Sequence, residues 1–158
     1  MNNILWLVGQ QLAGKTSLAN FLRIYDVYTL NIGEQLRKNH TPNDFLKSEN
    51  SYAPHFVETQ VQGMIQAFIR DNVDQLLLII DSAPRNPAQF DIMMKYREQS
   101  QIVIIKQPFA LRQSRALMKY KGDLAYFNDR EKFEQEWLKY VESLCSQEHI
   151  STIQIGRE

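Results

Sequence analysis

The sequence predicts an α/β fold in which a doubly wound, five-stranded parallel sheet carries helices on both faces. Apolar segments alternate along the chain with segments of helical periodicity, as in repeated strand-helix units. Three apolar segments, residues 4 to 8, 76 to 80 and 102 to 105, are not interrupted by polar residues, which is typical of strands buried on both faces. In such folds ligands bind beyond the carboxyl ends of the strands.

The individual elements follow from local patterns. Leu18, Leu22 and Tyr25 recur at the spacing of a helix with one buried face. The pair Asn86-Pro87 suits a helix start, because asparagine caps the first turn and proline is tolerated at the next position. We expect strands at 4–8, 27–31, 76–80, 102–105 and 150–155, helices at 16–25, 33–39, 54–71, 87–98, 109–120 and 129–147, and loops at 40–51 and 121–128.

Composition indicates one domain and argues against binding of nucleic acid or of an anionic membrane as its main role. The length of 158 residues suits a single core, here taken as one domain over residues 1 to 158. Eighteen basic and eighteen acidic residues cancel without a basic tract, which argues against a nucleic-acid or membrane surface. The lone Cys145 excludes an internal disulfide, and its helical context predicts a buried or half-buried structural thiol. No apolar run approaches the roughly 18 residues of a membrane span. We expect a soluble, cytoplasmic, monomeric protein.

The first predicted strand runs directly into Gly9-x-x-x-x-Gly14-Lys15-Thr16, the P-loop signature, and then into a helix. Glycines at both ends let backbone N–H groups approach a polyphosphate, and the helix start offers free amides to it. Lys15 would reach the β- and γ-phosphates, and the Thr16 hydroxyl would bind Mg²⁺. We therefore predict ATP and Mg²⁺ as cofactors, with Gly9, Gly14, Lys15, Thr16 and Ser17 at the nucleotide. The alternative is a glycine-bearing turn with a solvated lysine.

A second group of polar residues follows the apolar strand at 76 to 80. Asp81 has the place of a Walker B acid, which would hold Mg²⁺ near Thr16. The alternative is a carboxylate that caps a helix or lies in a loop. Arg85 and Gln89 follow at intervals of four residues. A planar guanidinium suits a phosphate, and an amide suits the edge of a nucleobase.

Together these residues resemble the nucleoside monophosphate kinases, adenylate kinase above all. Three segments carry the resemblance: residues 81 to 89 are similar to the family pattern DGFPRxxxQ, residues 31 to 37 to STGDLLR, and residues 107 to 119 to a VP pair that leads into a DRxxxR helix. The retained residues are Asp81, Pro84, Arg85, Gln89, Gly33, Leu36, Arg37, Pro108, Leu111 and Arg115, with Lys119 in place of an arginine.

The resemblance implies a P-loop NTPase fold of the nucleoside monophosphate kinase type and an ATP:nucleoside monophosphate phosphotransferase activity. On the acceptor side, Gly33, Arg37 and Arg85 would bind the monophosphate substrate, and Gln89 would contact its base. Taken alone, Arg37 also suits a solvated helix charge and Gln89 a surface amide, because charged and amide side chains are mostly exposed.

On the ATP side, the resemblance implies that Arg115 stacks on the base and that Lys119 approaches the phosphates. Lys15, Arg85, Arg115 and Lys119 then form the catalytic set. As single residues, Arg115 and Lys119 are equally well read as solvated charges on a helix.

The sequence departs from the family pattern where the two substrates would be enclosed. Residues 34 to 72 would close over the acceptor, and residues 120 to 128 would form a short lid over ATP. This lid lacks the two family arginines, for which Lys121 and Arg130 are the candidates, and Ile32 replaces a threonine near the acceptor. Two alternatives therefore stay open: a P-loop kinase of a non-nucleotide metabolite, and a nucleotide-binding protein that senses nucleotides without transferring phosphate.

Overall fold

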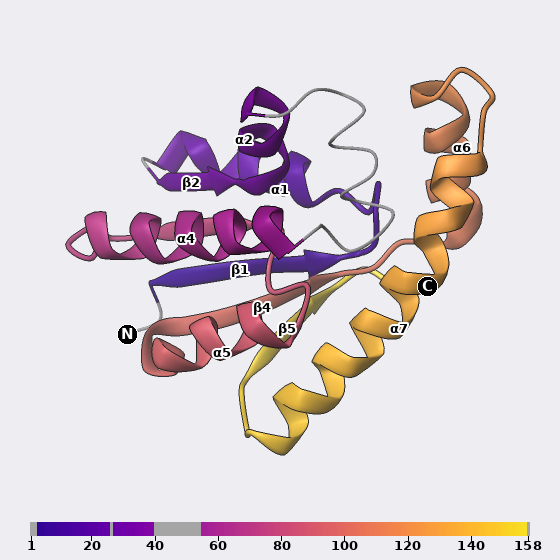
Figure 1. The fold of residues 1–158 in the computed structure, drawn as a ribbon. Helices are drawn as coiled ribbons and strands as arrows, with labels where there is room; N and C mark the ends of the chain where they lie inside the picture. Colours follow the sequence, from indigo (N-terminus) through magenta and orange to yellow (C-terminus); the bar gives the residue numbers. More distant parts are fainter. Residues whose placement is uncertain (1–2, 26, 40–54, 158) are drawn as a thin grey trace.

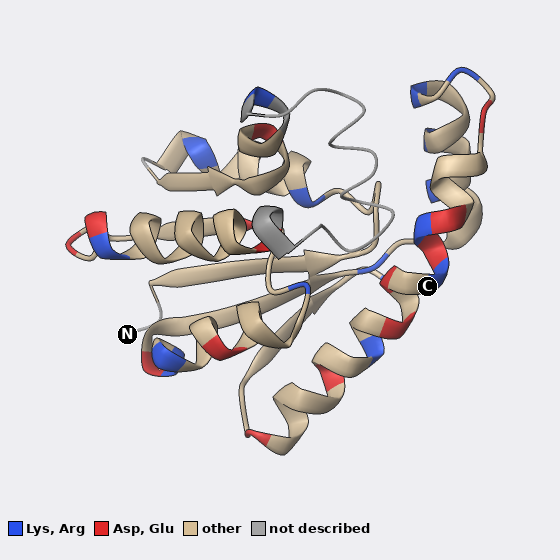
Figure 2. Ribbon diagram, in the orientation of Figure 1, with Lys and Arg blue, Asp and Glu red and all other residues tan. Residues whose placement is uncertain are grey.

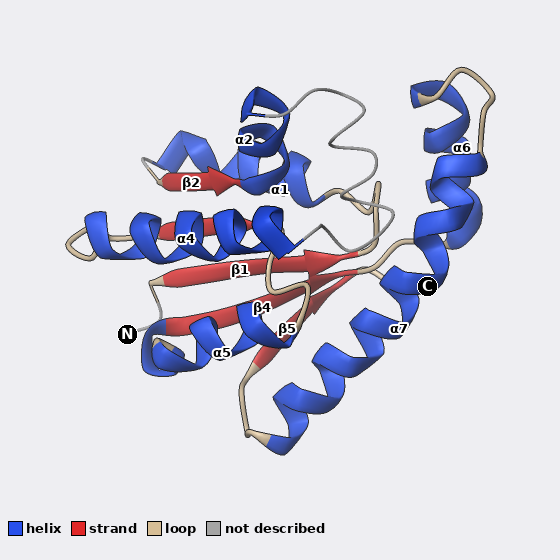
Figure 3. Ribbon diagram, viewed as in Figure 1, coloured by secondary structure: helices blue, strands red, loops and turns tan. Residues whose placement is uncertain are grey.

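A computed structural model of the chain describes residues 3–25, 27–39 and 55–157. Within these residues, five strands form one parallel sheet in the order β2-β3-β1-β4-β5, as Figure 1 and Figure 3 show. The predicted doubly wound α/β fold is therefore confirmed. The strands are β1 (Ile4–Gly9), β2 (Tyr28–Asn31), β3 (Leu78–Asp81), β4 (Ser100–Ile105) and β5 (Thr152–Ile155).

Helices cover both faces of the sheet, and the apolar side chains divide between two cores. The larger core joins one face of the strands, including Trp6 and Ile80, to α4, α5 and α7. The smaller core joins the other face, including Leu7 and Val103, to α1. The described helices are α1 (Lys15–Leu22), α2 (Ile32–Asn39), α4 (His55–Asp71), α5 (Pro87–Lys95), α6 (Phe109–Lys119) and α7 (Ala125–Gln147), with short 3₁₀ turns at Arg23–Tyr25 and Arg97–Gln99.

The register of the sheet brings three chemically important positions to one edge. Leu7 of β1 pairs with Asp81 of β3, and Asp81 pairs in turn with Asn31 of β2. β1 therefore runs two residues, Val8 and Gly9, past the last residue of β3 before the loop begins. In Figure 1, α6 and the start of α7 project beyond this carboxyl edge of the sheet, where they can contact the same loop.

Three local predictions are wrong. Tyr25 is 65% exposed, because α1 ends at Leu22 and the chain continues as a 3₁₀ turn. Leu76 is 83% exposed and precedes β3, which begins at Leu78. Residues 125 to 128, predicted as loop, form the first turn of α7, so that only residues 120 to 124 separate α6 from α7.

Other expectations are confirmed or lie outside the described residues. Cys145 is buried, at 2% exposure, in the larger core. Acidic and basic residues are interspersed along α7 (Figure 2). In the described part of the chain, no helix has the length and apolar character that crossing a bilayer requires. The predicted loop at 40–51 and the helix start at Pro54 lie outside the described residues.

Candidate active site

The loop between β1 and α1 has the backbone that the P-loop motif predicts. Gly14 adopts φ +105°, a conformation that L side chains rarely take, and the helix starts at the next residue. Leu12 also lies in the left-handed region, at φ 60°. At Gly9 the constraint is space, since a Cβ there would lie 2.5 Å from the carbonyl oxygen of Ile105. The loop is thus shaped by its own backbone and by close contact with β4.

Lys15 is buried inside this loop. Its ammonium donates to the carbonyl oxygens of Gly9 and Gln10, at 2.6 and 2.9 Å. Burial lowers the pKa of Lys15 to about 8, and the positive charges of Arg85 and Arg130 act in the same direction, whereas Glu134 and Asp81 oppose the shift. The loop therefore holds a cation that is poorly solvated and that an entering anion would stabilise.

Thr16 and Asp81 meet at the edge of the sheet. The Thr16 hydroxyl donates to Asp81 Oδ2 at 2.9 Å, and Asn31 Nδ2 donates to the same oxygen at 3.4 Å. A hydroxyl and a carboxylate side by side are hard oxygen ligands of the kind that Mg²⁺ takes when phosphates and water complete its shell. Among the described residues, no group of three or more His, Cys, Asp or Glu side chains is arranged to hold a metal by itself.

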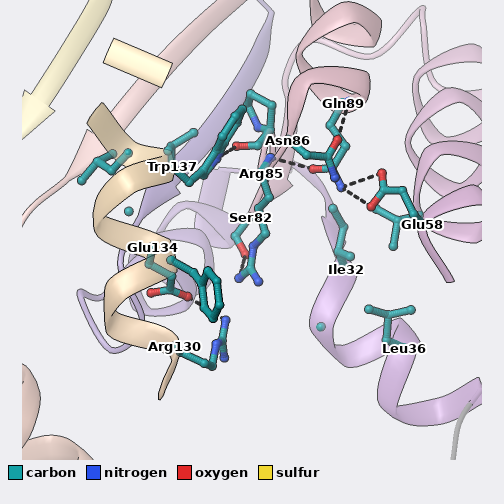
Figure 4. A pocket seen from close by; sticks show the side chains of 17 residues that line it. Ile32, Leu36, Glu58, Ser82, Arg85, Asn86, Gln89, Arg130, Glu134 and Trp137 are labelled. Atoms are coloured by element: carbon teal, nitrogen blue, oxygen red, sulfur yellow. Dashed lines mark hydrogen bonds and ion pairs between the residues drawn. The ribbon is translucent and has the colours of Figure 1, made fainter. Parts of the chain in front are cut away.

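Two cavities meet beside the P-loop. The larger, which we term the P-loop cleft, has a volume of about 740 Å³ and follows the loop from Gln11 to Leu18. The smaller, termed the side pocket and shown in Figure 4, has about 120 Å³ and lies between the P-loop, α2, α4, α5 and α7. The first volume is in the range of roughly 300 to 1,000 Å³ that small-molecule sites occupy. The residues that line both cavities are Gly33, Ser82, Arg85 and Arg130.

The structure brings most of the sequence-predicted residues to these two cavities. Gly9, Gly33, Arg85 and Gln89 line the side pocket. The P-loop cleft is lined by Gly14, Lys15, Thr16, Ser17, Asp81, Arg115 and Lys119, together with Gly33 and Arg85. Arg37 belongs to α2, but its side chain lies outside the described part of the structure.

Arg115 and Lys119 approach the cleft from α6. The Arg115 guanidinium donates to the carbonyl oxygen of Leu12 at 2.7 Å, which fixes it over the P-loop. The Lys119 ammonium lies 5.4 Å from the centre of the Tyr120 ring. Lys121, one candidate for a lid arginine, lines neither of the two cavities, whereas Arg130 lines both.

The polar groups of Gln89 are engaged within the protein. Its Oε1 accepts the backbone N–H of Arg85 at 2.7 Å, and its Nε2 lies 3.2 Å from both carboxylate oxygens of Glu58. Gln89 is 3% exposed. The Arg85 side chain donates to Ser82 Oγ at 2.8 Å. The loop after β3 is therefore held in shape by its own side chains and by α4.

Sequence reasoning missed the contribution of α7 to the side pocket. Figure 4 shows Arg130, Glu134 and Trp137 on this helix at one end of the pocket, with Glu58 and Gln89 at the other end. The Trp137 indole donates to the carbonyl oxygen of Pro84 at 2.8 Å. The apolar spacing of Phe133 and Trp137 assigns them to the core, although Phe133 is 41% exposed and lines the pocket. The signal available in the sequence was the Arg130-x-x-x-Glu134 spacing, which places two opposite charges on one face of this helix.

The sequence matches none of the protein families and none of the curated proteins with which it was compared. Solved structures are similar in fold. A shikimate kinase from Acinetobacter baumannii in complex with shikimate has a TM-score of 0.61 at 14% identity, over 100% of this chain and 85% of that chain. A shikimate kinase from Bacteroides thetaiotaomicron has a TM-score of 0.58 at 15% identity, over 95% and 84%.

A third similar structure belongs to the PezAT chromosomal toxin-antitoxin system of Streptococcus pneumoniae. Its TM-score is 0.60 at 17% identity, over 99% of this chain and 70% of that chain. At such identities the likeness concerns the fold. The chain therefore has the fold of P-loop kinases, with a five-stranded parallel sheet in the described residues and helices on both faces.

Proposed function

We propose that this chain is a P-loop kinase that transfers the γ-phosphoryl group of ATP to a small acceptor bound in the side pocket. The observation that carries the proposal is the contact of 2.9 Å between Thr16 Oγ1 and Asp81 Oδ2. This contact joins the P-loop hydroxyl to the carboxylate after β3, and Mg²⁺-dependent P-loop enzymes require both groups. It lies in the wall of the P-loop cleft, which meets the side pocket.

ATP occupies the P-loop cleft in this proposal. The backbone amides of the loop and the Lys15 ammonium bind the phosphates. Gly9 and Gly14 let the backbone come close to the phosphates, and Ser17 lies beside the nucleotide. Arg115 and Lys119 lie at the cleft wall formed by α6, where Arg115 would stack on the base and Lys119 would approach the phosphates. Thr16 and Asp81 would hold Mg²⁺, which supplies charge neutralisation at the phosphate oxygens when it is bound.

Transfer takes place where the two cavities meet. Arg85 and Arg130 line both of them, so each guanidinium can reach groups bound on either side. Phosphoryl transfer asks the protein mainly to position the reactants and to neutralise charge on the equatorial oxygens. We assign Arg85 to the acceptor and Arg130 to the charge that the missing lid arginines would otherwise supply.

The first candidate acceptor is a nucleoside or deoxynucleoside monophosphate, as the adenylate kinase-like pattern implies. Arg85 and Arg37 would hold its phosphate, Gly33 would pass close to it, and Gln89 would contact the base. The single domain would close on its substrates through residues 34–72 on the acceptor side and the short lid of residues 120–128 on the ATP side, excluding water.

The second candidate is a non-nucleotide metabolite that carries hydroxyl groups. It is favoured by the state of Gln89, whose amide is buried and engaged by Glu58 and by the backbone of Arg85. A base could be contacted by Gln89 only if these hydrogen bonds were rearranged. The Glu58 carboxylate, which lines the side pocket, suits an acceptor that donates hydrogen bonds.

The experiment is an ATP and Mg²⁺ assay against ribo- and deoxynucleoside monophosphates and against polyhydroxylated small metabolites, with phosphorylated products scored directly. One product well above the rest would name the acceptor class. Lys15→Ala is the control that removes transfer while leaving Glu58 and Gln89 in place. ATP binding without any product would contradict the kinase proposal and favour a nucleotide sensor.

A further inference from the structure

One carboxylate of α7 touches both halves of the proposed site. Glu134 Oε2 accepts the backbone N–H of Gln11 in the P-loop at 2.5 Å. Its other oxygen, Oε1, accepts from Arg130 Nη2 at 2.7 Å. Only 12% of the Arg130 side chain and 15% of the Glu134 side chain are exposed. Both acceptor oxygens are therefore engaged, in a part of the protein where charged hydrogen bonds are shielded from water.

The surroundings of Arg130 leave its guanidinium little freedom. Nη1 donates to the Tyr126 hydroxyl at 2.9 Å, and the guanidinium lies 5.4 Å from the centre of the same ring. Tyr126 in turn packs edge-on against Tyr120, with ring centres 5.4 Å apart. The guanidinium is thus held between an aromatic face and the Glu134 carboxylate, in the wall that the two cavities share.

Electrostatics connects the same carboxylate to Lys15. Burial alone would raise the pKa of Glu134, but Arg130, Lys15 and Arg85 and the Gln11 amide hold it below its usual value. Glu134 is in turn the strongest of the influences that oppose the lowering of the Lys15 pKa. The Glu134 carboxylate therefore stabilises the charged form of Lys15, and the three cations stabilise the carboxylate in return.

We propose that Glu134 is a positioning residue, whose two oxygens fix the Arg130 guanidinium at the junction of the cavities and tie it to the P-loop. The part of this inference that concerns rate rests on the proposed function. The part that concerns the placement of Arg130 does not. A misplacement of about 1 Å can cost about 10²-fold in rate, so a residue that holds Arg130 in place affects turnover without touching a substrate.

Glu134→Gln is the informative variant, because an amide has one acceptor oxygen where the carboxylate has two. Either Arg130 or the Gln11 N–H then faces an NH₂ group. Glu134→Asp keeps two acceptor oxygens and serves as the conservative rescue. Glu136→Gln is the matched control, since it removes the same charge from an exposed position of α7 that lines neither of the two cavities.

The placement of Arg130 can be measured without turnover, from the guanidinium N–H signals in ¹⁵N-¹H NMR spectra. A guanidinium held by fixed acceptors rotates slowly and shows separate Nη–H signals. We expect separate signals for Arg130 in the wild type and in Glu136→Gln. In Glu134→Gln we expect either averaged Arg130 signals or a shifted backbone N–H signal of Gln11, because one amide oxygen can serve only one of these two donors. Arg112, bound to Glu131 at 2.8 and 2.5 Å, is an internal reference that stays unchanged. Separate Arg130 signals together with an unshifted Gln11 N–H signal in Glu134→Gln would overturn the proposal.

Kinetics tests whether the placement matters for transfer. In Glu134→Gln we expect kcat to fall about 10- to 100-fold with the KM for ATP unchanged or lower. In the Arg130→Met background the same substitution should cause a much smaller further fall in kcat, because only the contact of Glu134 to the Gln11 N–H and its charge near Lys15 are then left to lose. Independent, multiplicative losses would overturn the role of Glu134 in catalysis. A wild type that transfers nothing contradicts the proposed function, while the NMR result still decides the placement.

Discussion

The P-loop cleft and the side pocket are built in different ways. Much of the wall of the cleft is a continuous run of chain from Gln11 to Leu18, whose form is set by local backbone conformation. The side pocket takes single residues from α2, α4, α5 and α7, which only the tertiary fold brings together. A motif can therefore specify the first cavity, whereas the second depends on side chains with ordinary local patterns. The site of the proposed phosphoryl donor is therefore easier to predict from sequence than the site of its acceptor.

The largest effect is expected at the residue that anchors the cleft. Lys15→Ala should lower transfer by about 10³-fold with every acceptor, because it removes the buried charge that would face the transferred group. The measurement is kcat with two chemically different acceptors, with thermal unfolding as the control for folding. An effect confined to one acceptor would contradict the assignment of Lys15 to the cleft, which every acceptor shares.

The side pocket predicts a more selective effect for Arg85→Ala. Loss of a charged hydrogen-bond donor amounts to roughly 1.5 to 3 kcal/mol, so the KM of the acceptor should rise about 10- to 100-fold while ATP affinity changes little. Arg115→Ala is the matched control, since Arg115 lines the cleft and not the side pocket, and it should weaken ATP. Equal loss of both ligands in Arg85→Ala would contradict the assignment.

Gly9 tests whether backbone packing shapes the cleft. In Gly9→Ala the new methyl group would meet the Ile105 carbonyl oxygen at 2.5 Å, and we expect a loss of about 1 to 3 kcal/mol in the free energy of unfolding. Gly63→Ala in α4 meets nothing within 4 Å and should gain about 0.5 to 1 kcal/mol. Chemical denaturation of both variants measures the difference. Equal stabilities would mean that β4 yields at this contact.

The smallest effect concerns pH. The pKa of Lys15 is about 8 in the free protein, and bound phosphates would raise it. Below pH 8 the ammonium is already charged, whereas above pH 8 ATP binding must take up a proton, so affinity should fall by up to about tenfold per pH unit. Calorimetry at pH 8.5 in buffers of different ionisation enthalpy measures how many protons are taken up when ATP binds. Heats that do not depend on the buffer would contradict this prediction.

The same pKa shift affects folding. In the unfolded chain Lys15 titrates near its ordinary value of 10.5. Between pH 8 and 10.5 the unfolded chain therefore binds more protons than the folded one. The destabilisation that this group causes is fully present below pH 8 and is relieved as the pH rises through this range.

Much of the fold can be predicted from the sequence, because an apolar run and the P-loop glycines indicate where several of its elements lie. The uninterrupted apolar run that ends at Asp81 and the glycines of the P-loop place β3, β1 and α1. The start of α7 could not be placed, because its apolar spacing begins only at Phe133. Its first turns are stabilised instead by polar tertiary contacts, such as the buried Arg112 guanidinium on Glu131.

The site was predictable only in part, for a related reason. The backbone conformation of the P-loop is set by its own local sequence, so Lys15 and Thr16 lie where the motif implies. The environment of a helical side chain is decided by its neighbours in space. Trp137 packs against the larger core, as its apolar spacing suggests, but it also lines the side pocket, which that spacing does not indicate. Likewise, nothing in the sequence indicates that Glu58 engages the amide of Gln89 across 31 positions.

The hydrogen bonds of Lys15 to the carbonyl oxygens of Gly9 and Gln10 have a consequence for what can enter the cleft. A ligand must offer this ammonium oxygens that hold it better than two carbonyl groups do. Hydrogen bonds to a charged group contribute about 1.5 to 3 kcal/mol each, so a weakly charged anion gains little from the exchange. We therefore expect the loop to bind polyphosphates in preference to small anions that carry a single charge.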